Sequence, residues 1–375
     1  HRAGIRVVMD VVYNHTAITK GGNFERTVPG YFYRTDEEGK WANASGCGNE
    51  TASERPMMRR FMIESVCYWA REYHIDGFRF DLMGIHDIET MNAIRKALDK
   101  IDPTICMYGE GWAAGKPQLP DSLLAMKKHA VQLPHIGMFC DEMRDSLRGP
   151  WGNDAKGAFV IGRMGYAAGV KFGLAGGIAH PQLVSDKESA VPAFWAAQPE
   201  QMISYVSCHD DLCLADRLKT TLPGLSALEM NALAKLAATA VFTSQGIPFW
   251  YAGDEILRDK QGVANSYKSP DEINAINWGR KTSQRDFFDY VRGLIAMRKA
   301  HPSFRMGDAD LIAKHLEFLP VPASNVVAFR IKGSPAGDSW LNTIVVLNAR
   351  TEPVQIDVPE GRYWIACRDG RIDNV

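Results

Sequence analysis

The sequence has almost no excess of charge of either sign. Its 375 residues carry 43 lysines and arginines against 44 aspartates and glutamates, which gives a formal net charge of -1. Nucleic acids and anionic membranes attract proteins through clusters of positive charge. We therefore expect no nucleic acid as a partner, and a neutral ligand agrees better with this composition.

Long apolar runs are also missing. No hydrophobic segment approaches the roughly 18 to 20 residues that a membrane-spanning helix needs, so no membrane-spanning segment is expected. The seven cysteines are odd in number and scattered along the chain. No two of them have the spacing of a zinc finger. We therefore expect neither a disulfide framework nor a metal site, and nothing in the sequence calls for a cofactor.

What the sequence does contain is a repeated alternation of short apolar runs and amphipathic stretches. The runs have the character of strands buried on both faces, and they lie at residues 5–12, 75–80, 104–108, 136–140, 202–207 and 247–251. Apolar residues recur at intervals of three and four, as in helices, at 56–73, 87–98, 228–242 and 285–300. Strands that alternate with helices predict an α/β fold. The shape of the Gly- and Ala-rich stretch 149–199 is not predicted.

After residue 302 the pattern changes to strands without helices. Short runs rich in valine, isoleucine and aromatic residues lie at 325–332, 341–348, 354–358 and 363–367. Turn-forming residues separate them. The sequence therefore predicts two domains: an α/β barrel domain over residues 1–303 and a small antiparallel β domain over residues 304–375.

Four of the apolar runs end in clusters of acidic residues, histidine or arginine. These segments are 10–15 (DVVYNH), 76–81 (DGFRFD), 108–112 (YGEGW) and 205–210 (YVSCHD). A (β/α)8 barrel carries its catalytic groups at the C-terminal ends of its parallel strands. Asp81, Glu110 and Asp210 would then converge on one mouth of the barrel. Carboxylates grouped in this way are typical of glycoside hydrolysis.

The same four segments resemble the signature regions of the α-amylase superfamily of glycoside hydrolases, in the same order. Segments 45–49 (SGCGN), 76–83 (DGFRFDLM) and 108–112, and the stretch 246–278, resemble type I pullulanases in particular. The resemblance covers roughly residues 1 to 300. It implies a (β/α)8 TIM-type barrel, of which this chain would hold about six strands and lack the N-terminal part. A C-terminal antiparallel β-sandwich would follow the barrel.

The resemblance also implies an activity and a set of roles. The activity is hydrolysis of α-1,6 branch linkages in α-glucans such as pullulan, glycogen or limit dextrins, by double displacement. Asp81 would be the nucleophile and Glu110 the general acid/base, while Asp210 would favour the distorted sugar ring of the transition state. His15 and His209 would hydrogen-bond the same sugar.

The residues themselves give physical reasons for this division of labour. Arg79 lies two positions before Asp81, on the same face of a strand, so its cation should keep Asp81 ionised. Glu110 is flanked by glycines and lies near Trp112, where partial desolvation would favour retention of a proton. The side chains of Leu82, Met83 and Trp112 are candidates for stacking on sugars beyond the cleavage point.

On the opposite side of the substrate we expect Asn265 and Tyr267. One position departs from the family pattern, because asparagine usually follows the His-Asp pair and this chain has Asp211. The exchange replaces an amide donor by a charge beside Asp210. We therefore expect Asp211 to lack a donor bond to sugar and to alter the preference for branches without abolishing hydrolysis.

Two other interpretations stay open at this point. The chain could be a non-catalytic or inactive carbohydrate-binding fragment, because six strands cannot close an eight-stranded barrel and leave two open edges. It could also be a metal-dependent barrel hydrolase that uses His15, His209, Asp210 and Asp211. The chain lacks the paired His-x-His motif of such enzymes.

Overall fold

The parallel strands of the chain are divided between two units. The computed structural model describes residues 1–186, 190–368 and 370–372. The first unit comprises His1–Phe139 and Trp195–Gln201, and the second comprises Cys140–Phe194 and Met202–Val375. Six parallel strands lie within these described residues, four in the first unit and two in the second. The α/β class, with a parallel sheet and added antiparallel strands, is confirmed.

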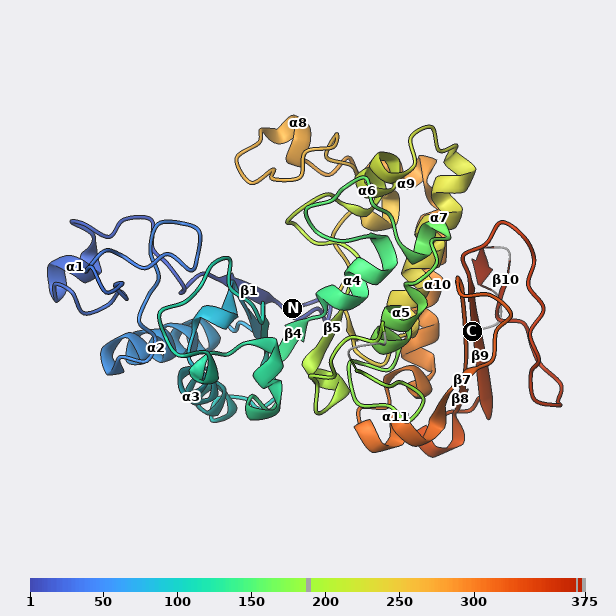
Figure 1. Ribbon diagram of the computed structural model, residues 1–375, viewed down its shortest axis with the longest axis horizontal. Helices are drawn as coiled ribbons and strands as arrows, with labels where there is room; N and C mark the ends of the chain where they lie inside the picture. The colour runs from blue at the N-terminus through green and yellow to red at the C-terminus, as the bar shows by residue number, and fades with distance from the viewer. Residues whose placement is uncertain (187–189, 369, 373–375) are drawn as a thin grey trace. The chain divides into compact units, whose positions relative to one another are not determined.

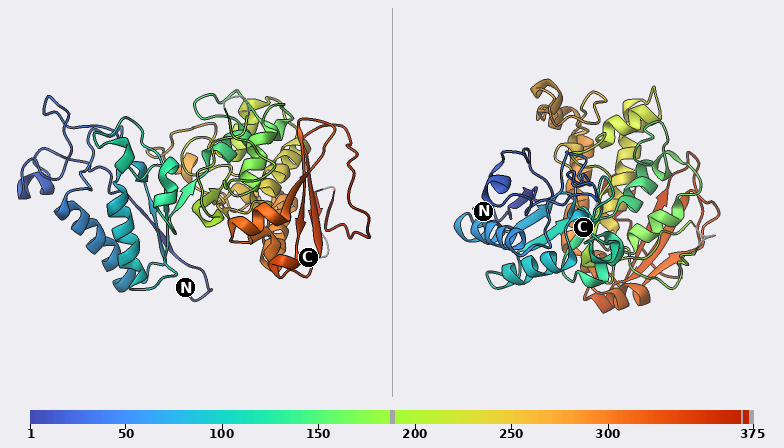
Figure 2. Two further views of the ribbon diagram at one scale, coloured as in Figure 1. Left: turned by 60° about the horizontal axis from the view of Figure 1, so that its bottom comes forward. Right: turned by 60° about the vertical axis from the view of Figure 1, so that its left-hand side comes forward.

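The first unit repeats a strand-helix pattern. Its strands pair in chain order and run parallel: β1 (Val8–Val11), β2 (Gly77–Phe80), β3 (Cys106–Gly109) and β4 (Gly137–Phe139). Helices α2 (Pro56–Glu72) and α3 (Ile88–Asp99) connect the first three strands and lie side by side (Figures 1 and 2). The remaining elements are short: α1 (Asn23–Thr27), η1 (Met83–Ile85), η2 (Asp121–Leu123), η3 (Lys127–Gln132) and η5 (Pro199–Gln201).

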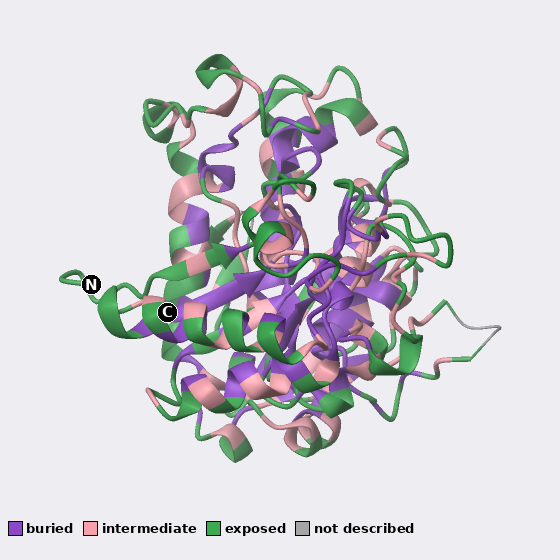
Figure 3. Ribbon diagram, turned by 90° about the vertical axis from the view of Figure 1, so that its left-hand side faces the viewer, coloured by how far each residue is buried: buried purple, intermediate pink, exposed green. Residues whose placement is uncertain are grey.

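Local sequence explains the two helices. Pro56 occupies the first turn of α2, and the buried residues Met58, Met62, Val66 and Ala70 recur every four positions on one face. The side chain of Asp87 caps α3 by accepting a hydrogen bond from the Thr90 N–H at 2.8 Å. Figure 3 shows the result, with helices that alternate buried and exposed residues around strands that are largely buried.

Strand β1 does not match the expectation of burial on both faces. Ile5, Val7 and Val8 are exposed, and only Val11 of the strand is buried. The reason is its position, because β1 lies at the outer end of the strand order and pairs with β2 on one side. Strand β2, which has neighbours on both sides, is buried at all four positions. Sequence alone did not distinguish the outer strand from the inner one.

The second unit contains parallel strands β5 (Met202–Ser204) and β6 (Ile247–Pro248). Helices α6 (Leu214–Thr221) and α7 (Ala227–Thr243) connect them, and α7 packs along α10 (Arg285–Ala300). A capping box between Ser226 and Glu229 begins α7. The stretch 149–199 holds α5 (Ala167–Leu174) and η4 (Phe159–Ile161). Further elements are α4 (Asp141–Arg148), η6 (Asp254–Ile256), α8 (Asp271–Asn274), α9 (Arg280–Ser283), η7 (Pro302–Arg305), α11 (Ala309–His315) and η8 (Ser334–Ala336).

Antiparallel strands form the C-terminal part of this unit. Strands β7 (Leu316–Leu319), β8 (Val326–Lys332) and β9 (Asn342–Asn348) make one sheet, packed against α5, α7 and α11 (Figure 2), and β10 (Cys367–Arg368) pairs with β11 (Arg371–Ile372). The expected strands at 325–332 and 341–348 are confirmed, whereas 354–358 has no regular structure and β7 was not predicted. The domain boundary at residues 303 and 304 stays a prediction. Among the described residues, no helix is long and apolar enough to cross a membrane.

Candidate active site

One arginine on the middle of β2 brings three carboxylates together in the first unit. The sheet register places Arg79 between Asp10 on β1 and Tyr108 on β3. Nη1 of Arg79 lies 2.9 Å from Oδ1 of Asp10 and 3.0 Å from Oδ1 of Asp81. Nη2 lies 2.8 Å from Oε1 of Glu110. The spacing of two residues therefore brings the Arg79 guanidinium into contact with Asp81, and the same guanidinium also binds Glu110.

The electrostatics of this cluster are dominated by the buried cation. The Arg79 side chain is 8% exposed. Burial lowers the pKa of Arg79, but the charges of Glu110, Asp10 and Asp81 outweigh it, and the net effect is a pKa above the ordinary value. The guanidinium therefore stays charged near neutral pH. The ring of Phe139, 6.0 Å away, lies beneath it.

Asp81 begins the loop after β2 and is fixed at both carboxylate oxygens. Its N–H donates to the Val11 carbonyl at 3.0 Å, which continues the strand pairing by one residue. Oδ1 meets Arg79, and Oδ2 accepts from Nδ2 of Asn14 at 2.8 Å. The same Asn14 nitrogen donates to the Asp81 carbonyl at 2.7 Å. Asn14 was not among the predicted site residues, although it lies inside the segment 10–15 that carries the family resemblance.

Glu110 follows β3 directly, and its carboxylate contacts the Leu82 N–H and the Arg79 guanidinium. Its Oε2 accepts from the backbone N–H of Leu82 at 2.8 Å, and its Oε1 contacts Arg79. Leu82 presents this N–H because its backbone is left-handed, with φ of 37°. The proton expected on Glu110 from partial desolvation stays a prediction.

The other predicted residues of the first unit are His15 and Trp112, and both are half-buried. Nδ1 of His15 lies 2.6 Å from Oδ1 of Asn14, so Asn14 links this ring to Asp81. Trp112 follows Glu110 by two residues, and the ammonium of Lys127 lies 5.7 Å from the centre of its ring. Both side chains retain surface for contact with a ligand, whereas Met83, expected to stack on sugar, is fully buried in η1.

The segment 45–49, which carries part of the family resemblance, fixes the backbone beside His15. Asn49 accepts from the Thr16 N–H at 3.0 Å and donates to the Thr16 carbonyl at 2.7 Å. This two-way pairing uses both ends of one side-chain amide. The hydroxyl of Thr51 adds a bond to the Tyr13 carbonyl at 2.6 Å.

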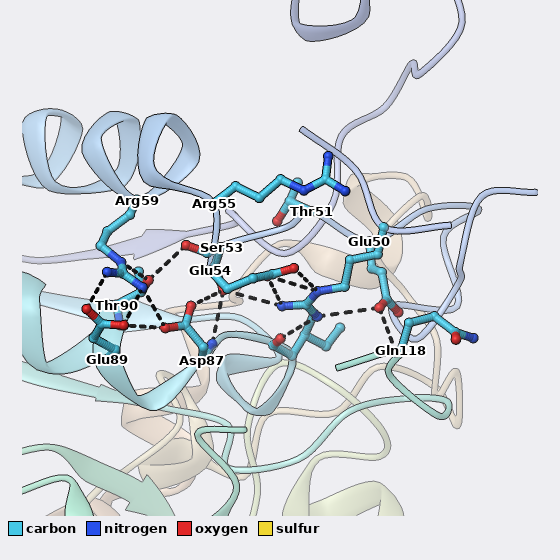
Figure 4. A network of polar contacts seen from close by, with 12 residues as sticks. Glu50, Thr51, Ser53, Glu54, Arg55, Arg59, Asp87, Glu89, Thr90 and Gln118 are labelled. Atoms are coloured by element: carbon cyan, nitrogen blue, oxygen red, sulfur yellow. Dashed lines mark hydrogen bonds and ion pairs between the residues drawn. The ribbon is translucent and has the colours of Figure 1, made fainter. Parts of the chain in front are cut away.

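A buried ion pair holds the segments that follow both carboxylates (Figure 4). Arg34 and Glu50 are buried and their nearest charged atoms lie 3.4 Å apart. Arg34 Nη1 donates to the Ile85 carbonyl at 2.8 Å, four residues after Asp81. Oε1 of Glu50 accepts from the Gln118 N–H at 3.0 Å, in the loop after β3. One loop therefore fixes both chain segments that leave the candidate site.

The network in Figure 4 extends to the start of α3. The hydroxyl of Ser53, which precedes α2, donates to Oδ2 of Asp87 at 2.7 Å. Burial raises the pKa of Asp87, but hydrogen bonds from Ser53 and Thr90 and the charge of Arg59 outweigh it, and the net pKa is lowered. Asp87 thus remains a charged helix cap inside the protein.

In the second unit, His209 and Asp210 project from the loop after β5. Their side chains are about half exposed, and His209 Nε2 lies 3.7 Å from Asp210 Oδ1. Asp211 is placed differently from the expectation. Its side chain is 6% exposed and its Oδ2 lies 2.7 Å from Nη2 of the buried Arg148. The Asp211 carboxylate therefore points into the protein and pairs with Arg148, whereas a position beside the sugar was expected.

The backbone conformation at position 211 explains why an aspartate suits this position. Its φ of 65° lies in the left-handed region, which asparagine and aspartate adopt more readily than other residues with a side chain. Asn265 and Tyr267 lie in an exposed loop of the same unit. Nδ2 of Asn274 fixes that loop by donating to the Ser266 carbonyl at 2.7 Å. The side chains of Asn265 and Tyr267 are therefore exposed and lie outside the core.

A buried acid that the sequence analysis did not single out lies in the same unit. Asp254 is 1% exposed and accepts a hydrogen bond from the Ser207 hydroxyl. Burial raises the pKa of Asp254 to about 7; the bond from Ser207 opposes this and the charge of Glu255 adds to it. Across the described residues, no group of three or more His, Cys, Asp and Glu side chains is arranged to hold a metal ion.

Because the pKa of Asp254 is raised, we expect the free energy of unfolding to decrease as pH rises. Above the ordinary value of 3.8 the unfolded chain releases this proton while the folded protein keeps it up to about pH 7. The free energy of unfolding therefore falls as pH rises through this window, by on the order of 4 kcal/mol in total. We expect Asp254→Asn to melt higher than the parent chain at pH 8 and equally at pH 4. A constant difference in melting temperature at both pH values would contradict this assignment.

Two family models match parts of this chain, and similar proteins cover most of it. Residues 49–288 match the family described as alpha amylase, catalytic domain, and residues 312–371 match the pullulanase all-beta domain. A pullulanase of Bacillus subtilis is 38% identical over 98% of this chain and 50% of its own length. Pullulanase 1 of Arabidopsis thaliana is 30% identical over 84% of this chain and 38% of its own length.

Solved structures give the same result. The structure of a Paenibacillus barengoltzii pullulanase in complex with maltohexaose and alpha-cyclodextrin superposes with a TM-score of 0.90 at 45% identity. The match covers 96% of this chain and 54% of that chain. The chain thus spans about half the length of the relatives from Bacillus and Paenibacillus that it matches.

Proposed function

Because this chain belongs to the α-amylase catalytic-domain family, we propose that it supplies the catalytic centre of a retaining glycoside hydrolase that cleaves α-1,6 branch linkages in α-glucans. The observation that supports this most is the contact of one guanidinium with both Asp81 and Glu110. Two carboxylates on one cation lie close together. Double displacement requires that closeness, at a separation of about 5 Å.

The proposed reaction has two steps. Asp81 attacks the anomeric carbon, the bond to the leaving oxygen breaks, and Glu110 gives that oxygen its proton. Glu110, now ionised, then takes a proton from water, whose oxygen displaces Asp81 and releases the sugar. Arg79 holds both carboxylates in position, and the Leu82 N–H also holds Glu110. These donors stabilise the negative charge that each carboxylate carries at one stage of the cycle.

The remaining residues receive roles in substrate binding. Asp210 stabilises the charged, distorted sugar ring of the transition state, and His15 and His209 bind its hydroxyl groups. Trp112 and Leu82 offer apolar surface to the sugars beyond the cleavage point. The exposed Asn265 and Tyr267 bind more distant sugars. We assign Asp211 a supporting role through Arg148, in place of a contact with sugar.

Specificity for α-1,6 linkages rests on the similarity to pullulanases. The matched structure from Paenibacillus barengoltzii is a complex with maltohexaose and alpha-cyclodextrin, which supports an α-glucan as the ligand class. No cofactor enters this reaction, because acid, base and nucleophile are all carboxylates of the chain.

A comparison of two polymers tests the proposal. We expect the purified chain to release maltotriose from pullulan, whose maltotriose units are joined by α-1,6 bonds, and to leave a linear α-1,4 glucan intact. Activity should be unchanged by a chelator, and loss after chelation would favour the metal-dependent alternative. Tight binding of maltotriose without release of sugar from pullulan would contradict the hydrolase and favour a carbohydrate-binding fragment.

A further inference from the structure

A fully buried lysine binds the backbone carbonyls of the two residues that flank Asp210. Lys260 has no exposed surface. Its Nζ donates to the carbonyl of Asp211 at 2.8 Å and to the carbonyl of His209 at 3.2 Å. These two residues flank Asp210, whose own side chain is about half exposed. The ammonium therefore fixes the backbone before and after Asp210, while about half of the Asp210 side chain stays exposed.

The same ammonium also contacts a second loop. Nζ of Lys260 lies 3.4 Å from the Ala264 carbonyl, directly before Asn265 in the exposed loop that carries Tyr267. The backbone N–H of Lys260 is itself fixed, because it donates to Oδ2 of the buried Asp216 at 2.6 Å. One anchored cation thus joins the segment 209–211 to the segment 264–267.

Other buried donors complete the support of the first segment. Nη1 of Arg148 donates to the Leu212 carbonyl at 2.7 Å, and its Nη2 meets the Asp211 carboxylate. Sγ of Cys208 lies 3.6 Å from the Asp210 carbonyl. All four carbonyls from residue 209 to residue 212 therefore accept from side chains. The shape of this segment depends on side-chain donors, since it lies outside any strand or helix.

We propose that Lys260 is a positioning residue that sets the orientation of Asp210 and couples it to the loop bearing Asn265 and Tyr267. The inference rests on the proposed function for the role of Asp210. Removal of the ammonium leaves three carbonyls without this donor and frees the backbone of the residues that flank Asp210. A displacement of about 1 Å in a group that acts in the transition state is enough to reduce the rate about 100-fold.

The test is the variant Lys260→Met, which keeps the length and apolar stem of the side chain. Lys235→Met is the matched control, because Lys235 is a second buried lysine of the same unit and contacts Asp286 and the Gly370 carbonyl. We expect Lys260→Met to lower kcat on pullulan about 100-fold with KM within about 3-fold, since Asp210 acts mainly in the transition state. The control should retain kcat within about 3-fold.

Hydrogen exchange makes the result independent of activity. In Lys260→Met the amides of 208–214 and 263–267 should exchange faster together, by at least about 10-fold, while Lys235→Met leaves both segments unchanged. Exchange unchanged in either segment, or a kcat within about 3-fold of the parent, would overturn the inference. If the parent chain itself releases nothing from pullulan, the proposed function fails, and the exchange measurement alone decides the role of Lys260.

Discussion

Asp81→Asn is expected to lower kcat on pullulan by at least about 10^4-fold, because an amide cannot form the covalent glycosyl intermediate. The variant keeps the shape of the side chain, and its amide oxygen can still accept from Arg79. Affinity for maltotriose should therefore stay within about 5-fold of the parent. The measurement is the initial rate of reducing-sugar release at saturating pullulan, together with calorimetric titration of maltotriose.

Asp10→Asn is the matched control for this prediction. Asp10 binds the same Arg79 nitrogen at 2.9 Å, but its side chain is 53% exposed and it precedes the end of its strand. We assign it a structural role in holding the guanidinium, so kcat should fall by less than about 10-fold. Equal losses in the two variants would show that the charge around Arg79 matters and that Asp81 has no special role as a nucleophile.

Glu110→Gln is expected to show the second large effect. Glutamine cannot protonate the leaving oxygen of pullulan, so kcat should fall by about 10^3-fold. With α-maltotriosyl fluoride the departing fluoride needs no proton, and only the second step is impaired. Azide attacks without the help of a base, so it should raise the turnover of this fluoride by Glu110→Gln at least about 10-fold.

The comparison that decides the assignment uses Asp81→Asn under the same conditions. This variant forms no glycosyl intermediate, so azide has nothing to intercept and should not raise its turnover of the fluoride. Recovery in both variants, or in neither, would contradict the division of roles between Asp81 and Glu110. Both variants exchange a carboxylate for an amide of the same size, which keeps their structural effects comparable.

The main features of the first unit could be predicted from local sequence. Asp81 and Glu110 directly follow short apolar strands, and parallel strands end at one edge of a sheet. The period of two residues along a strand also predicted the contact between Arg79 and Asp81. The sequence did not predict the contact between Arg79 and Glu110, because this contact depends on the register of β2 against β3.

The supporting residues escaped prediction for a related reason. Arg34 meets the carbonyl of Ile85, which lies 51 positions away, and Lys260 meets that of His209, also 51 positions away. Buried charges of this kind resemble surface charges in the sequence, because their partners are backbone atoms of distant loops. Asp211 was misplaced in the same way, since its pairing with Arg148 has no local signal.

Burial was predicted least well where a strand lacks a neighbour. The apolar run at 5–12 has the composition of an inner strand, yet β1 pairs on one side and its outer residues are exposed. At the C-terminal end, the run at 354–358 is rich in β-forming residues but is not a strand. The β-propensity of a segment shows that its residues suit a sheet, but it does not show whether a neighbouring strand is present.

The most direct test of the central claim is the anomeric form of the first product. Nuclear magnetic resonance of maltotriose, recorded within minutes of adding the chain to pullulan, distinguishes the α from the β anomer before mutarotation. Two carboxylates bound to one guanidinium predict double displacement, which retains the α configuration of the cleaved bond. The maltotriose released first should therefore be the α anomer. Initial release of β-maltotriose would show direct attack by water and would contradict the assignment of Asp81 as the nucleophile.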